Sequence, residues 1–238
     1  MTVPDDYECL KGMTIKDVPR QFIVKNGHPQ PYQGIAIDCK EGTSFQVARD
    51  FIKSVPESAR QMLIDEVNTF FTVNENERAV VTFSVRSMLD LYLQARKFPP
   101  GSEIIMTGMN IPDMVQIMKE HQIKVVPVDL DIATMMPCVE DVRKALSPQT
   151  KACIFAYIYG CTYDIAPFVE ILNAANVEII EDCAQSFRSL EKFKGSDFAT
   201  MTMFSFGLIK FNTAFYGAVT VFRNLNETHR QPNEKLLC

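Results

Sequence analysis

The chain has 238 residues, enough for one large domain or two small domains with a hydrophobic core. Apolar residues make up 47% and charged residues 22%, which excludes a wholly disordered chain, a collagen and a low-complexity linker. The net charge of −5 argues against binding of nucleic acid, which would require a basic face.

Seven cysteines are scattered along the chain without a C-x-x-C pair, at positions 9, 39, 138, 153, 161, 183 and 238. Because the chain has three histidines besides, this spacing argues against a structural zinc site, and we expect no metal. Scattered cysteines in odd number are typical of reduced thiols in an intracellular protein. The first ten residues are acidic and lack the pattern of a signal peptide, so we expect a cytoplasmic protein.

The first 70 residues change from irregular to helical. Residues 1–40 contain several prolines and glycines, so we expect an irregular N-terminal segment. A helix is predicted over residues 44–53. A second helix is predicted to open at Val55-Pro56-Glu57 and to run to Phe70, because its apolar residues recur at helical spacing. A polar turn follows at residues 74–78.

From residue 79 onward, short apolar runs alternate with amphipathic stretches of about ten residues. Strands are predicted over residues 79–83, 103–106, 123–128, 151–157, 177–180, 200–204 and 218–222. Helices are predicted between them over residues 87–97, 112–121, 137–146 and 166–175. This alternation indicates an α/β fold with a mostly parallel central sheet flanked by helices. Ligands of such folds bind at the carboxyl ends of the strands.

The segment from residue 200 to 222 is long enough to span a bilayer and holds a single charged residue, Lys210. A lysine near the centre would cost about 2.5–3.5 kcal/mol on insertion into a membrane. The segment is also rich in Phe, Thr and Val, so two buried strands joined by a loop explain it better than a spanning helix. We therefore expect no membrane association.

A possible anion site follows the strand at residues 79–83. The next residues are Ser84-Val85-Arg86-Ser87, at the start of a predicted helix. Free backbone N–H groups at a helix N-terminus bind phosphate, and Arg86 and the serines, Ser87 among them, would add further donors. The alternative interpretation is an ordinary serine N-cap beside a solvated arginine.

Two other strand ends carry charged residues. Glu181 and Asp182 follow a buried strand, and a buried carboxylate needs a cationic partner; the alternative is that Asp182 caps a helix. Lys210 lies between apolar residues after the next strand. Loss of water around this amine would lower its pKa and make it a usable nucleophile, unless the side chain extends out to solvent.

Taken together, a phosphate-binding helix end, a carboxylate and a buried lysine at neighbouring strand ends are the parts of a pyridoxal 5′-phosphate site. In such a site the lysine forms a Schiff base with the cofactor. The carboxylate pairs with the pyridine nitrogen, and the helix N-terminus holds the phosphate.

Several motifs resemble those of the DegT/DnrJ/EryC1/StrS family of sugar aminotransferases, whose members have fold type I of the pyridoxal phosphate-dependent enzymes. The likeness covers roughly residues 79–223. It rests on Glu181-Asp182-Cys183-Ala184-Gln185-Ser186, on Gly195-Ser196-Asp197, and on Phe204-Ser205-Phe206 with Lys210. Upstream it includes Pro100-Gly101-Ser102-Glu103, Val126-Pro127-Val128-Asp129, Thr150-Lys151-Ala152 and Tyr159-Gly160.

The resemblance implies a role for each matching residue. Lys210 would carry the cofactor as a Schiff base and move a proton, and Asp182 would pair with the pyridine nitrogen. Gln185 would lie near the phenolic oxygen, Ser205 would bind the phosphate, and Ile111 would cover the ring.

The activity implied by the resemblance is transfer of an amino group from an amino acid to a keto sugar linked to a nucleotide. Relatives with histidine in place of the lysine are dehydratases, and Lys210 argues against that branch. The resemblance also implies a homodimer.

Some residues depart from the family pattern. Val85-Arg86 replaces a Gly-Thr pair, so a valine side chain could obstruct the phosphate, and Ile111 replaces an aromatic residue. Ala214-Phe215-Tyr216-Gly217 replaces a glycine-rich run.

We expect an irregular segment over residues 1–40, a large cofactor domain over 41–223 and a polar tail over 224–238, with the family's small C-terminal domain absent.

The departures from the family pattern and the absent C-terminal domain leave an alternative function open. The chain could be a catalytically degenerate or truncated relative that keeps the fold as a binding or dimerisation module.

Overall fold

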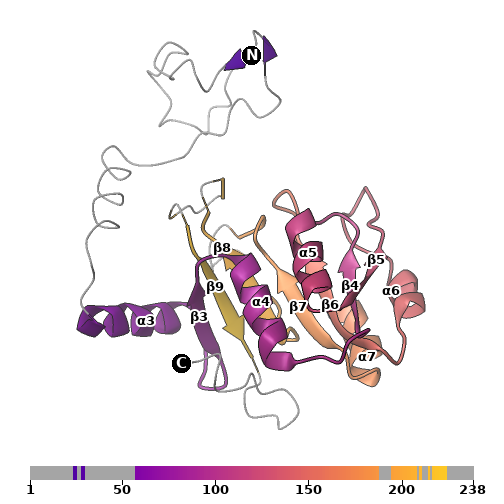
Figure 1. Ribbon diagram of the computed structural model, residues 1–238, viewed down its shortest axis with the longest axis horizontal. Helices are drawn as coiled ribbons and strands as arrows, with labels where there is room; N and C mark the ends of the chain where they lie inside the picture. The colour runs from indigo at the N-terminus through magenta and orange to yellow at the C-terminus, as the bar shows by residue number, and fades with distance from the viewer. Residues whose placement is uncertain are drawn as a thin grey trace. The chain divides into compact units, whose positions relative to one another are not determined.

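The computed structural model describes residues 24–25, 28–29, 57–187, 194–207, 209–210, 214 and 216–223 (Figure 1). The chain divides into two units, Met1–Ser54 and Val55–Cys238. In the first unit, the two-residue strands β1 (Val24–Lys25) and β2 (His28–Pro29) pair antiparallel. The helix predicted over residues 44–53 and the tail after residue 223 lie outside the described residues.

The second unit is built on a seven-stranded sheet with the order β3-β9-β8-β7-β6-β4-β5. The strands are β3 (Arg78–Thr82), β4 (Glu103–Thr107), β5 (Lys124–Val128), β6 (Thr150–Ala156), β7 (Glu178–Asp182), β8 (Met201–Ser205) and β9 (Ala218–Phe222). Each strand that the sequence predicted is present, with ends shifted by at most two residues.

Within this sheet, β9 runs against its two neighbours, β3 and β8, while β8, β7, β6, β4 and β5 pair in parallel. The antiparallel steps on either side of β9 leave β3 pointing the same way as the parallel strands. The carboxyl ends of six strands therefore meet at one edge of the sheet. The prediction of an α/β fold with a mostly parallel sheet is confirmed.

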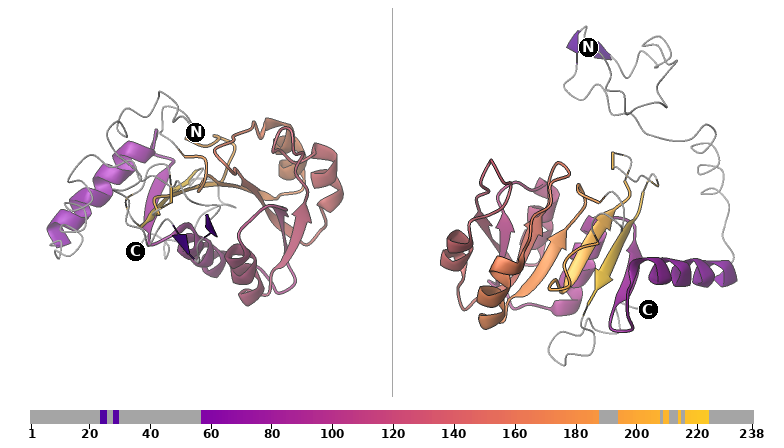
Figure 2. Two further views of the ribbon diagram at one scale, coloured as in Figure 1. Left: turned by 90° about the horizontal axis from the view of Figure 1, so that it is seen from above. Right: turned by 180° about the vertical axis from the view of Figure 1, so that it is seen from behind.

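Helices cover both faces of the sheet (Figures 1 and 2). One hydrophobic cluster packs α4 (Val85–Arg96) and α5 (Pro112–Glu120) on the sheet, with Met88, Leu89 and Met118 fully buried. On the opposite face, a second cluster packs α6 (Val139–Ala145) and α7 (Ala166–Ala174), with Phe168 and Leu172 fully buried. The helix α3 (Glu57–Phe71) leads into β3 and contributes Phe71 to that second cluster.

The start of α4 differs from the sequence prediction. Ser84 is extended, with φ −161° and ψ 164°, and its hydroxyl oxygen accepts a hydrogen bond from the backbone N–H of Ser87 at 3.1 Å. This N-cap starts the helix at Val85, whereas the prediction placed the start at Ser87. Val85 and Arg86 consequently belong to the first turn, where backbone N–H groups have no partner within the helix.

The apolar segment from residue 200 to 222 contains β8 and β9, which pair antiparallel with Phe204 opposite Val219. The prediction of two strands in this segment is confirmed. Among the helices of the described residues, none is both long enough and apolar enough to cross a membrane.

Strand β7 extends two residues beyond its predicted end, so that Glu181 and Asp182 belong to the strand. Glu181 pairs with Phe155 and Asp182 with Ala156 across the parallel β6. Successive side chains of a strand point to opposite faces, so the two carboxylates point apart. Residues 184–186 form a turn, so among the described residues Asp182 caps no helix.

Glu181 is completely buried and accepts three hydrogen bonds. The donors are the hydroxyl of Tyr157 at 2.6 Å, the backbone N–H of Ser196 at 2.7 Å and the hydroxyl of Thr202 at 2.9 Å. Burial raises the pKa of Glu181, and these donors together with the charge of Arg223 oppose that rise. A satisfied carboxylate of this kind holds β7 and β8 to the loop before β8.

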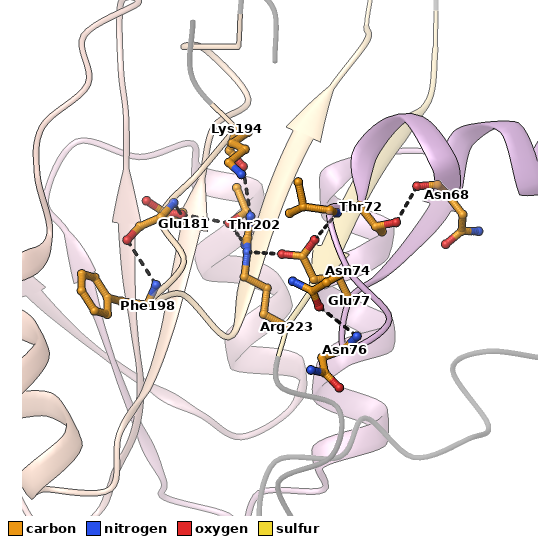
Figure 3. A network of polar contacts seen from close by, with 12 residues as sticks. Asn68, Thr72, Asn74, Asn76, Glu77, Glu181, Lys194, Phe198, Thr202 and Arg223 are labelled. Atoms are coloured by element: carbon orange, nitrogen blue, oxygen red, sulfur yellow. Dashed lines mark hydrogen bonds and ion pairs between the residues drawn. The ribbon is translucent and has the colours of Figure 1, made fainter. Parts of the chain in front are cut away.

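Arg223 extends the same network to the edge of the sheet (Figure 3). Its guanidinium donates to the hydroxyl of Thr202 at 2.7 Å, to the backbone oxygen of Lys194 at 3.0 Å and to Glu77 at 3.1 Å. The side chains of Arg223 and Glu77 are each only 5% exposed. The buried ion pair therefore joins the end of β9 to the turn that precedes β3.

Gly195 packs directly on this network. It has φ +86°, and a Cβ atom there would lie 2.5 Å from the hydroxyl oxygen of Thr202 and 2.9 Å from a carboxylate oxygen of Glu181. We expect Gly195→Ala to lower the free energy of unfolding by roughly 2–4 kcal/mol, because it combines backbone strain with overpacking. Urea denaturation measures this loss.

The matched control for this substitution is Gly101→Ala. Gly101 has φ +82°, but nothing lies within 4 Å of the position that its Cβ atom would take. It carries the same backbone strain without the crowding, and we expect it to cost about 1 kcal/mol. Equal losses at both positions would show that the contact with Thr202 and Glu181 contributes nothing.

Candidate active site

Two cavities lie at the edge of the sheet where the carboxyl ends of the strands meet. The larger has a volume of about 300 Å³ and the smaller of about 50 Å³. The residues lining the larger one are Phe83, Ser84, Val85, Arg86, Ile111, Asp182, Ala184, Ser205, Gly207, Ile209, Lys210, Tyr216 and Gly217. The two cavities adjoin, because four residues line both of them: Ile111, Asp182, Ala184 and Lys210.

Lys210 follows β8 in a turn in which its backbone N–H donates to the carbonyl of Gly207 at 3.0 Å. Its half-buried side chain lines both cavities. Burial lowers the pKa of Lys210; the negative charge of Asp182 opposes this shift, and the positive charge of Arg86 adds to it. The amine therefore loses its proton at a lower pH than an ordinary lysine does, as the sequence predicts.

Asp182 lies at the end of β7 and is 8% exposed. One of its carboxylate oxygens accepts a hydrogen bond from the backbone N–H of Ala184 at 3.0 Å. Burial raises the pKa of Asp182, while that hydrogen bond and the charge of Lys210 act in the opposite direction. No described residue forms an ion pair with Asp182, so the carboxylate is open to a cationic group in the cavity.

The first turn of α4 forms one wall of the larger cavity. No described residue accepts a hydrogen bond from the backbone N–H groups of Val85 or Arg86, which makes them available to an anion. The guanidinium of Arg86 pairs with Asp113 at 2.9 Å, and its side chain is 50% exposed. Val85 is 6% exposed and packs in the core under α4, so its side chain is directed largely into the protein interior.

The other predicted site residues are divided between the two cavities. Ser205 ends β8 and lines the larger one, and Gln185 lines the smaller one, where its side-chain oxygen accepts from the backbone N–H of Tyr159 at 3.3 Å. Ile111 lines both and is 40% exposed. Ser87 lines neither cavity, and its hydroxyl lies 3.0 Å from that of Ser84.

Other residues that line the cavities were not predicted as site residues, although Tyr216 stands in the run that departs from the family pattern. The rings of Phe83 and Tyr216 stack at 5.3 Å with an interplanar angle of 17°, and both are more than half exposed. This contact depends on the pairing of β3 with β9, which no local pattern indicates. Asn110, in the smaller cavity, stands directly before the first turn of α5 and has no signal in the sequence beyond that position.

The described residues contain no group of three or more His, Cys, Asp or Glu side chains that could hold a metal ion. The polar groups that face the cavities are a lysine amine, a carboxylate, an arginine, hydroxyls, amides and backbone N–H groups. This set is suited to an organic ligand with an anionic end and a basic nitrogen.

The fold and the cavity together define the class of the protein. The mostly parallel mixed sheet with helices on both faces is the fold of its structural neighbours, which are pyridoxal phosphate-dependent enzymes of fold type I. A family model described as the DegT/DnrJ/EryC1/StrS aminotransferase family matches residues 66–231. The chain belongs to this family, and the predicted membership is confirmed.

The protein is similar to GDP-perosamine synthase of Escherichia coli O157:H7, with 30% identity over 142 residues. This match covers 58% of the chain and 38% of the relative, so the matched region spans well under half of the relative's length.

Solved structures share the fold. E. coli GDP-4-keto-6-deoxy-D-mannose-3-dehydratase with bound hydrated PLP matches with a TM-score of 0.62 and 19% identity, over 82% of this chain and 49% of that one. The aminotransferase from Psychrobacter cryohalolentis gives the same TM-score of 0.62, identity of 19% and coverage of 82% and 49%.

The charge of Asp182 affects the pKa of Lys210, and this coupling can be tested by titration. Replacing Asp182 by Asn removes the negative charge that raises the pKa of Lys210, so this pKa should fall further. At about pH 8, below the ordinary lysine pKa, a larger fraction of Lys210 should then react with acetic anhydride. Competitive acetylation followed by peptide mapping measures the fraction, with Lys151 of the same digest as the internal reference. An unchanged or raised pKa of Lys210 would contradict electrostatic coupling between the two residues.

Proposed function

We propose that the protein is a pyridoxal phosphate-dependent aminotransferase that transfers an amino group from an amino acid to a keto sugar linked to a nucleotide. One observation carries the proposal. Asp182 at the end of β7 and Lys210 in the turn after the neighbouring β8 line one cavity of about 300 Å³, and the first turn of α4 forms one of its walls. Membership in the family and the similarity to GDP-perosamine synthase support the reaction class and the sugar substrate.

The residues present fit pyridoxal phosphate. The buried carboxylate of Asp182 forms no direct ion pair with a described residue, and a protonated pyridine nitrogen would supply one. The N–H groups of Val85 and Arg86, the Arg86 guanidinium and the Ser205 hydroxyl could together bind the phosphate. Ile111 would cover the ring and Gln185 would lie near its edge. Ser87 would act only by supporting the N-cap of α4.

When bound, pyridoxal phosphate supplies an electron sink that stabilises negative charge on the carbon of the amino donor. Lys210 would bond to the cofactor through Nζ and, once released, hold and move the proton at that carbon. Burial serves this role because it lowers the pKa of Lys210 and leaves a larger fraction of the amine with a free electron pair. Asp182 would keep a proton on the pyridine nitrogen, and hence the ring electron-poor.

For the larger context, we propose that residues 41–223 are the cofactor-binding domain and that the protein acts as a homodimer. The dimer is supported by the exposed apolar rim of the cavity, which includes Phe83, Ile209 and Tyr216. We also propose a cytoplasmic location, which is supported by the free thiols of the described cysteines, Cys138, Cys153, Cys161 and Cys183.

Labelling tests the proposal directly. Incubation with pyridoxal phosphate, reduction with borohydride and peptide mapping should place the label on Lys210, because its side chain lines the cavity and burial lowers its pKa. Lys210→Ala should abolish this label, while Lys151→Ala should leave it in place. A label on other lysines, or none, would refute the cofactor assignment.

Activity is measured with the same protein. Amino-group transfer from glutamate to a nucleotide-linked keto sugar supports the aminotransferase. Cofactor bound at Lys210 without any transfer would instead identify a catalytically degenerate relative that keeps the fold as a binding module.

The role of Arg86 is tested by comparing ligands with and without a phosphate. Arg86→Gln should weaken pyridoxamine phosphate binding roughly tenfold, the loss of one charge-assisted contact, and should leave pyridoxamine binding unchanged. Asp113→Asn is the matched control, because it removes the partner of Arg86 and keeps the guanidinium. Isothermal titration measures both ligands, and equal losses for the two would exclude a phosphate contact.

A further inference from the structure

The side chain of Asn110 has a polar atom without a partner beside the proposed cofactor site. Asn110 follows β4, precedes α5 and lines the smaller cavity together with Asp182 and Lys210. Its side-chain oxygen accepts a hydrogen bond from the backbone N–H of Ile111 at 2.8 Å. Its Nδ2 is buried and has no acceptor among the described residues. The oxygen is thus already engaged, and the two N–H donors remain to be used.

A buried donor without an acceptor is unfavourable in a folded protein, so its position needs an explanation. Four other side chains of the described residues have a buried hydroxyl without a hydrogen-bond partner: Tyr163, Ser186, Thr200 and Thr220. None of the four lines either cavity. Asn110 alone among these residues combines an unused donor with a position in the candidate site.

A pyridoxal phosphate ring bound between Asp182 and Lys210 would have one edge toward each of the two cavities. The larger contains the first turn of α4, the proposed phosphate site, and the smaller extends from the shared residues Asp182 and Lys210 toward Asn110. In pyridoxal phosphate, the carbon that bonds to lysine lies between the phosphate-bearing arm and the C3 oxygen. With the arm in the larger cavity, the C3 oxygen would face the smaller one. A volume of about 50 Å³ accommodates such an oxygen.

We propose that Asn110 is a cofactor-binding residue whose side-chain amide donates a hydrogen bond to the C3 oxygen of pyridoxal phosphate. This inference rests on the proposed function and adds to it a residue that fixes the tilt of the ring. Nδ2 is covered in the structure, and the broad terminal torsion of asparagine allows the amide to turn its nitrogen toward the ligand, with loss of the bond between its oxygen and the N–H of Ile111. Asn110 and Gln185 would then hold the same edge of the ring.

The test measures binding of pyridoxamine phosphate, which has the C3 oxygen but no aldehyde and so cannot bond to Lys210. Asn110→Ala should raise its dissociation constant roughly 10- to 100-fold, as expected for loss of a hydrogen bond to a charged oxygen. An analogue with hydrogen in place of the C3 hydroxyl should bind the wild-type protein and Asn110→Ala equally well. Ligand fluorescence under equilibrium dialysis gives both constants without any measurement of activity.

Two further variants control for packing. Asn110→Asp keeps the shape of the side chain but replaces the donor by an acceptor, so it should lose at least as much affinity as Asn110→Ala. Thr220→Val removes an unpartnered hydroxyl from β9, away from both cavities, and should leave binding unchanged. Thermal unfolding confirms that each variant folds.

The outcomes separate this inference from the proposed function. If Lys210 is labelled in the wild-type protein but Asn110→Ala binds pyridoxamine phosphate normally, only the role of Asn110 is refuted. An equal loss for both ligands overturns it as well, because Asn110 then acts on the site through packing alone. If the wild-type protein binds neither ligand and Lys210 takes no label, the proposed function itself is refuted.

Discussion

The alternation of side chains along β7 is the constraint on which the site depends. Because β7 continues through Glu181 and Asp182, one carboxylate faces each side of the sheet. Glu181 receives three hydrogen bonds and the charge of Arg223 on its side. Asp182 has one backbone donor and the charge of Lys210. The same strand thus carries one carboxylate that stabilises the fold and one that is available to a ligand.

Much of the fold could be predicted from the sequence, because the signals that define it are local. Apolar runs indicated the strands, helical spacing indicated α3, and the polar residues at the strand ends indicated Asp182 and Lys210. Boundaries were less predictable where a single hydrogen bond sets them. The hydroxyl of Ser84 caps α4 so that the helix starts two residues before its predicted start. Pairing with β6 extends β7 over two acidic residues, whose polarity had indicated that the strand ends before them.

The rest of the site depends on contacts between distant residues, which no window of sequence contains. The ion pair of Glu77 with Arg223 joins residues 146 positions apart, and the stacked rings of Phe83 and Tyr216 meet across β3 and β9. Burial of the Asn110 amide likewise follows from tertiary packing. Such contacts became visible only when the order of the strands was known.

The pairing of Arg78 with Phe222 places the first residue of β3 beside the last residue of β9. The chain therefore enters and leaves the seven-stranded sheet at adjacent points, and the ion pair between Glu77 and Arg223 fastens the two together. A domain whose two chain ends lie close together can be inserted into a surface loop of a host protein without stretching that loop. By the same geometry, a short peptide joining the two points would permit circular permutation with new ends at an exposed turn.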